Sequence, residues 1–222
     1  MFHFRLDKVK IDKNREEGGV LGLGKDLAEL EFWSFVVTDN QLLPDVSELL
    51  TTTDLERKKE LVTEITKNVL GVRQITKIDK IKDGAEMNFG FDLWRSLTIP
   101  DHFDWNFIVI ELDQDQHKTA QILQDVVSNG TIDRFAGSLP GKLIGVANPS
   151  FAAVTETAKF VVDIIRTGLQ NSDNDTVGIL YKSFNRTEHF PSGQAKAKNV
   201  QDITNNLWVD FSMYLDEGLA HK

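Results

Sequence analysis

The chain has 222 residues and a net charge of −9, from 34 acidic against 25 basic residues. That balance argues against nucleic acid as a partner, because such a protein needs a cationic surface that displaces counterions from phosphates. It contains no cysteine, which excludes disulfides, thiol nucleophiles and thiolate zinc sites, and no apolar run approaches the roughly 20 residues of a membrane span.

The first predicted elements are strands. Apolar residues alternate from Phe2 to Ile11 but shift phase by one residue, which predicts a strand with a bulge near Asp7–Lys8. A Gly-rich, charged loop follows from Asp12 to Asp26. Residues 29–38 are apolar on both faces and predict an interior strand.

The next region mixes helix and strand signals. Thr53 and Glu56 have the capping-box spacing and open a helix whose apolar stripe continues to Gly71. Residues 72–82 fit either a helix or a strand. Asp83-Gly84 predicts a turn that leads into a strand over 85–93.

The second half alternates strands with helices. Residues 105–112 form an apolar run that predicts a buried strand, and the amphipathic stretch 116–130 predicts a helix. A longer helix is expected from Pro149 to about Gln170. Two strands follow, at 177–184 and 206–215.

The fold class predicted is therefore mainly β with α insertions. We expect one domain over residues 1–222, an antiparallel β-sandwich of about seven or eight strands with about three helices. The helices belong to two insertions, near 44–71 and 116–172. Long excursions of this kind are compatible with a sandwich because their extra loop-closure entropy is small.

Several catalytic signatures are incomplete. The stretch Gly19–Asp26 matches most of a phosphate-binding loop, but Asp26 stands where a magnesium-binding hydroxyl is needed and no buried strand precedes it. The five histidines are scattered, without paired metal-ligand spacing, and no GxSxG elbow is present. The sequence therefore predicts a non-enzymatic protein and names no catalytic residue.

The strand at 105–112 ends abruptly in two carboxylates, Asp113 and Asp115. Two carboxylates on one loop provide the oxygen donors that a hard cation such as calcium requires. The alternative is structural, because Asp113 and Gln116 also have the spacing of a helix cap and its third residue.

The order of these signals resembles a C2 domain, the calcium- and phospholipid-binding β-sandwich. The run FIVIELDQD resembles the family's strand that enters a calcium loop, and Asp175-Thr-Val-Gly178 resembles the step into the next strand. The stretch GKDLAELEFWSFVV resembles the exit from the first calcium loop. That loop offers no clear counterpart of the family's first aspartate.

The resemblance implies a calcium site and a membrane-facing tip. Its metal ligands would be Asp26, Asp113, Asp115 and Asp175, brought together at one end of the sandwich. Leu21 and Leu23 would be the apolar tip that contacts a membrane, or alternatively fold back onto the core.

Three functions are open at this stage. The first is a non-catalytic binding module that uses calcium to dock on an anionic phospholipid surface or a protein partner, in a soluble protein that is cytoplasmic or peripheral to a membrane. The second is a metal-free structural or interaction domain of a larger assembly. The third is a hydrolytic enzyme, which a pocket holding carboxylates with raised pKa values would indicate.

Overall fold

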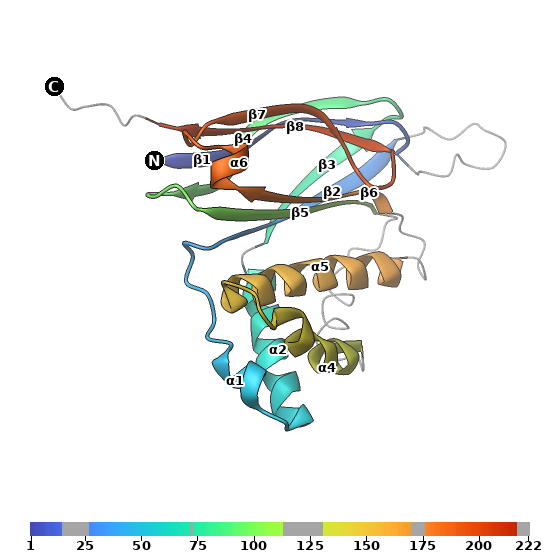
Figure 1. Cartoon of the computed structure of the whole chain (residues 1–222). Helices are drawn as coiled ribbons and strands as arrows, with labels where there is room; N and C mark the ends of the chain where they lie inside the picture. The colour runs from blue at the N-terminus through green and yellow to red at the C-terminus, as the bar shows by residue number, and fades with distance from the viewer. Residues whose placement is uncertain (15–26, 72, 113–130, 170–175, 217–222) are drawn as a thin grey trace.

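The strands form two antiparallel sheets of four strands each in a computed structural model that describes residues 1–14, 27–71, 73–112, 131–169 and 176–216. The strands are β1 (Phe2–Ile11), β2 (Ala28–Thr38), β3 (Gln74–Ile81), β4 (Glu86–Ser96), β5 (His102–Glu111), β6 (Thr176–Asn185), β7 (Ala195–Gln201) and β8 (Leu207–Leu215). The first sheet has the order β4-β1-β8-β7 and the second the order β3-β2-β5-β6. The sheets lie face to face, and helices cover the outer face of the second (Figure 1). The predicted β-sandwich with helical insertions is confirmed at this level.

An aromatic core fills the space between the sheets. Phe4 on β1 packs edge-on against Trp105 on β5, with ring centroids 5.0 Å apart, and Phe211 on β8 lies 5.5 Å from the same indole. The Trp105 N–H donates to Ser34 Oγ at 2.9 Å, which satisfies the one polar atom of the buried indole. The register of β1 against β8 shifts between Leu6 and Lys8, so the predicted bulge is confirmed.

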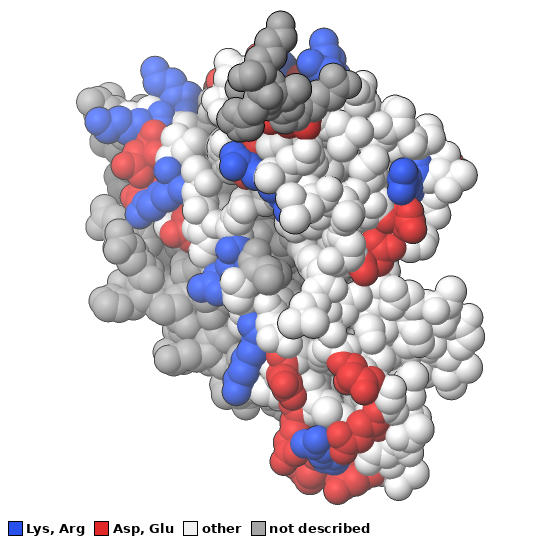
Figure 2. Space-filling view, turned by 90° about the vertical axis from the view of Figure 1, so that its left-hand side faces the viewer, with Lys and Arg blue, Asp and Glu red and all other residues white. Residues whose placement is uncertain are grey.

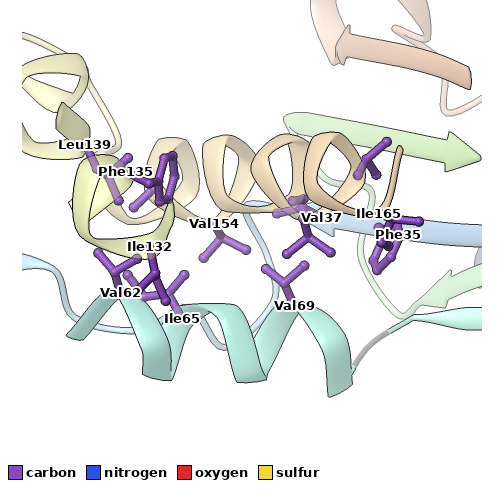
Figure 3. Close-up of a cluster of buried hydrophobic side chains, with 14 of the residues drawn as sticks. Phe35, Val37, Val62, Ile65, Val69, Ile132, Phe135, Leu139, Val154 and Ile165 are labelled. Atoms are coloured by element: carbon purple, nitrogen blue, oxygen red, sulfur yellow. The ribbon is translucent and has the colours of Figure 1, made fainter. Parts of the chain in front are cut away.

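The two inner strands of the second sheet, β2 and β5, are buried on both faces. The outer side of this sheet packs on a layer made of α1 (Ser47–Thr51), α2 (Leu55–Gly71), α4 (Thr131–Leu143) and α5 (Pro149–Leu169). Phe35 and Val37 of β2 meet Val69 and Ile165 from these helices in a second apolar core (Figure 3). Burying each such side chain contributes about 1.5–3 kcal/mol. This double burial explains why the sequence of β2 is apolar on both faces.

The helix starts confirm the predicted beginning of α5 and correct the predicted cap of α2. Asn148 Oδ1 accepts the N–H of Phe151 at 3.0 Å, one residue before the predicted start of α5 at Pro149. At α2 the expected capping box of Thr53 and Glu56 was wrong. Asp54 Oδ1 instead accepts the N–H of Glu56 at 2.9 Å, because an aspartate directly before the first turn reaches those amides better.

Four elements were not predicted, namely α1, α4, β7 and the short helix α6 (Arg186–His189). Helix α4 contains Pro140, a residue that normally ends a helix, and here the packing of Phe135 and Leu139 on the neighbouring helices compensates for it. Strand β7 is lysine-rich and bulged, with Asn199 at φ 52°. The ambiguous residues 72–82 form a strand from Gln74 onward, because they pair with β2. The helix expected at 116–130 lies outside the described residues.

A short helix, α6 (Arg186–His189), joins β6 to β7. Among the described residues, no helix is long and apolar enough to cross a membrane.

Candidate functional site

The predicted calcium ligands Asp26, Asp113, Asp115 and Asp175 lie outside the described residues, as do the predicted membrane contacts Leu21 and Leu23. This assignment therefore stays a prediction. The strand ends that flank these positions are described. The N–H of Leu112 donates to the carbonyl of Glu29 at 2.8 Å, and Ile110 pairs with Thr176. The start of β2, the end of β5 and the start of β6 thus lie at one end of the sandwich, which we call the loop end.

A buried polar cluster closes the loop end. The Asp202 carboxylate accepts four backbone N–H groups and the Thr204 hydroxyl, at 2.6–3.1 Å. Asn206 donates to the carbonyls of Lys13 and Val177 at 2.8 and 2.7 Å. These bonds tie β1, β6 and β8 together. Since its oxygens already accept five hydrogen bonds, Asp202 is a structural carboxylate rather than a spare metal ligand.

The described carboxylates at this end do not by themselves make a metal site. Asp83 accepts the N–H of Asn14 and the ammonium of Lys13, both at 2.8 Å, and these bonds lower its pKa. Within the described part of the chain, no group of three or more His, Asp or Glu residues is placed to hold a metal ion. A calcium site would therefore need the four predicted aspartates outside that part, and it stays a prediction.

The outer face of the first sheet carries an excess of basic side chains. Alternation along each strand sends apolar residues to the core and charged residues outward. Six basic residues face out against four carboxylates, a net charge of +2 in a chain of −9. The basic residues are Arg5, Lys8, Lys10, Arg95, Lys196 and Lys198, and the acidic ones are Asp7, Glu86, Asp92 and Asp210. We call this surface the cationic sheet face.

Asp92 organises one end of the cationic sheet face. Its side chain is 3% exposed and is held by His3 Nδ1, Arg5 Nε, Arg95 Nε and the Tyr214 hydroxyl at 2.8–3.1 Å. Burial alone raises the pKa of Asp92, but its four hydrogen-bond donors outweigh burial and lower the pKa to about 2. The ring of Tyr214 stacks on His3 with centroids 4.8 Å apart. One carboxylate therefore fixes two guanidinium groups, of which Arg5 also donates to the Tyr214 hydroxyl and Arg95 is exposed.

The lysines of the cationic sheet face differ in whether they have a described partner. Lys8 lies 3.5 Å from Glu86 and 3.9 Å from Asp210, while Lys10 lies 5.9 Å over the Trp208 ring. Lys196 and Lys198 on β7 are exposed, and no ion pair is described for either. These two lysines are the most available cations of the face.

A local acidic patch lies on the helical side. In Figure 2, which keeps the vertical axis of Figure 1, Asp and Glu side chains gather around a basic group at the bottom of the molecule. On α2, Arg57 binds Glu48 in a bidentate pair at 2.7 and 2.8 Å and Glu60 at 2.8 Å. The helices lie on the far side of the second sheet from the cationic sheet face (Figure 1).

One observation bears on the enzyme hypothesis. Asp104 on β5 is 3% exposed, and burial raises its pKa, although nearby Lys159 and the Ser183 hydroxyl partly offset this. The charge of nearby Glu156 adds to this rise, while the pKa of Glu156 itself is lowered by its pairs with Lys142 and Lys159. No hydrogen bond between these two carboxyl groups is described, and the enzyme hypothesis stays a prediction without a named catalytic residue.

The sequence analysis missed the residues of the cationic sheet face. His3, Arg5 and Lys8 occupy the outward positions of a strand that was correctly predicted, so the alternation contained the signal. Their grouping with Asp92 and Tyr214 depends on strands β4 and β8 pairing on either side of β1, which one sequence does not specify. Comparisons with protein-family models, curated proteins and solved structures gave no match to this chain.

Proposed function

We propose that this protein is a non-catalytic binding module of C2-like type that docks its cationic sheet face on an anionic phospholipid surface. The observation that carries the proposal is the net charge of +2 on that face in a chain of net charge −9. The resemblance of the sequence to C2 domains and the presence of two four-stranded antiparallel sheets support it. In this orientation the acidic patch of the helical side, with Glu48 and Glu60, points away from the membrane, where it is repelled least.

The lysines of β7 allow an estimate of how much the cationic sheet face contributes to the membrane-binding constant. A basic residue near an anionic membrane contributes roughly 1 kcal/mol, so Lys196 and Lys198 together contribute roughly 30-fold in the binding constant. Arg5, Arg95 and Lys8 contribute less per residue, because carboxylates partly neutralise them. Binding of this electrostatic kind weakens as salt shortens the screening length.

Calcium has a defined place in the proposal. Asp26, Asp113, Asp115 and Asp175 would hold the ion at the loop end, where it would cancel negative charge next to the membrane. Leu21 and Leu23 would then enter the headgroup region. Membrane binding that depends on calcium can be measured separately from membrane binding by the cationic sheet face, because the two involve different residues.

Sedimentation with phospholipid vesicles tests the proposal. We expect binding to vesicles that contain phosphatidylserine and none to pure phosphatidylcholine vesicles at the same salt. The double variant Lys196→Glu/Lys198→Glu should bind at least roughly 30-fold more weakly. The matched control is Lys58→Glu/Lys67→Glu on α2, which changes the net charge equally but on the helical side, and should retain more binding.

The calcium arm uses Asp113→Asn/Asp115→Asn. If calcium strengthens vesicle binding by the wild type, this variant should lose that strengthening. It should still bind vesicles as the wild type does without calcium. Absence of binding to anionic vesicles with and without calcium would refute the membrane proposal. An anionic protein surface would then be the remaining partner for the same face.

A further inference from the structure

A groove lies on the helical side of the molecule, far from the cationic sheet face. It has a volume of about 630 Å³ and is lined by the start of β5, the end of α4 and the first turns of α5. Its apolar wall includes Val146, Phe151 and Ala152, and its polar groups are His102, Lys142, Asn148, Thr155 and Glu156. This volume lies in the usual range for a small-molecule site, which combines an apolar wall with a few polar groups.

Thr155 is the first sign that the groove is made for a ligand. The residue is 6% exposed and lines the groove, and its hydroxyl has no hydrogen-bond partner among the described residues. A helical threonine ordinarily donates to the carbonyl four residues earlier, as Thr157 does to Ala153 at 2.8 Å. A buried hydroxyl without a partner costs stability, whereas an apolar side chain of the same shape would not.

Further buried polar groups without hydrogen-bond partners lie on β5, next to the groove. Asp104 and Asn106 follow His102 at alternate positions of β5 and are buried under α5, with 3% and 0% exposure. Asp104 Oδ1 and both amide atoms of Asn106 have no hydrogen-bond partner within the described residues. The surrounding core between the second sheet and the helices is built of apolar residues, and its buried threonines Thr66 and Thr157 donate to backbone carbonyls of their own helices. Polar groups concentrated at one place in such a layer indicate water or a ligand at that place.

The remaining hydrogen-bonding capacity of the groove favours a ligand with acceptor atoms. Glu156 already accepts from Lys142 at 2.7 Å and Lys159 at 3.4 Å, and these pairs lower its pKa although burial opposes the shift. Asn148 Oδ1 is used to cap α5. By contrast, the Lys142 ammonium has donors to spare, and the Thr155 hydroxyl is unused.

The backbone adds to this preference. The groove lies at the N-terminus of α5, a helix of 21 residues, where the helix dipole favours negative charge. The side-chain charges nearly balance, with Lys142 and Lys159 against Glu156 and Asp104. The groove therefore attracts an anion through hydrogen-bond donors that remain available and through the N-terminus of α5, rather than through net charge.

We propose that the groove between β5, α4 and α5 binds a small organic carboxylate whose apolar body lies on Phe151 and Ala152. The carboxylate accepts from Lys142 and Thr155. The imidazole of His102 lines the same groove and packs against Phe151, with ring centroids 5.8 Å apart. The site is independent of the membrane-docking proposal, since it shares no residue with the cationic sheet face or the loop end.

Methyl NMR titration tests the proposal on the full chain. Hexanoate and phenylacetate should shift the methyl resonances of Val146 and Ala152 saturably, whereas hexanol, phenylethanol and hexylamine should not. Thr155→Val, which keeps the shape of the side chain, should weaken carboxylate binding about 5- to 10-fold, and Lys142→Met about 10- to 100-fold. Lys67→Met on α2 removes an equal charge outside the groove and should bind as the wild type does.

Three outcomes would overturn the proposal. They are the absence of a saturable shift with either carboxylate, an equal response to the alcohols, and unchanged affinity in Thr155→Val. If that variant fails to fold, the ligand series on the wild type and the Lys142→Met variant still decide the question. Loss of vesicle binding by the β7 lysine variant with intact carboxylate binding would show that the two sites are separate.

Discussion

Replacing Asp92 with Asn perturbs both the stability of the protein and its proposed docking face. The substitution keeps the shape of the side chain but removes the charge that holds Arg5 and Arg95. The folded-state pKa of Asp92 is about 2, against an ordinary value of 3.8. At 1.36 kcal/mol per pKa unit, the ionised carboxylate stabilises the fold by about 2 kcal/mol at neutral pH.

The pH dependence follows from the sign of that shift. A carboxylate whose folded pKa is lowered contributes stability above its unfolded pKa and loses it as the pH falls through the folded pKa. The difference between wild type and Asp92→Asn should therefore be about 2 kcal/mol at pH 7, about 1 kcal/mol at pH 3, and close to zero below pH 2. Urea unfolding followed by tryptophan fluorescence measures these differences.

The same variant makes the cationic sheet face more positive by one charge. Asp92→Asn should therefore bind anionic vesicles more tightly while being less stable. A stability difference that is independent of pH between 7 and 3 would refute the electrostatic account of Asp92. Weaker vesicle binding by the folded variant would contradict the docking orientation.

Two further substitutions test the loop end. Gly178→Ala places a Cβ atom 2.7 Å from Leu207 Cβ, which forces the start of β6 away from β8 and should cost about 1–3 kcal/mol in thermal or urea unfolding; unchanged stability would contradict this close approach. Asp202→Ala leaves several buried N–H groups without their acceptor and should cost about 3 kcal/mol or more. The nearby surface variant Ile203→Ala, at a residue 56% exposed, should change stability by less than about 0.5 kcal/mol and serves as the control.

The sequence predicted the strands in which apolar and polar residues alternate clearly. In β8 the alternation from Leu207 to Met213 corresponds to one buried face, and in β1 the phase shift corresponds to the bulge. Strand β7 was missed because its only apolar residues in the first five positions are two alanines, and the lysines between them carry no strand preference. Its strand structure comes from pairing with β8.

The candidate sites were less predictable than the fold. The lysines of β7 and the outward residues of β1 lie far apart in the sequence, and only the β4-β1-β8-β7 order makes them one surface. The groove could not be predicted from the sequence for the same reason, because His102 and Thr155 line one groove only when α5 lies across β5. The four aspartates predicted from the resemblance are the part of the site that the described residues leave as a prediction.

Site-specific labelling tests the docking orientation most directly. Because the chain contains no cysteine, a single introduced cysteine carries an environment-sensitive fluorophore without background. Asn88→Cys places the label on an exposed outward position of β4, and Asn68→Cys places it on an exposed position of α2. On vesicles that contain phosphatidylserine, we predict a blue shift for the label at position 88 and none at position 68. A shift at position 68 alone, or equal shifts at both, would contradict the proposal that the cationic sheet face meets the membrane.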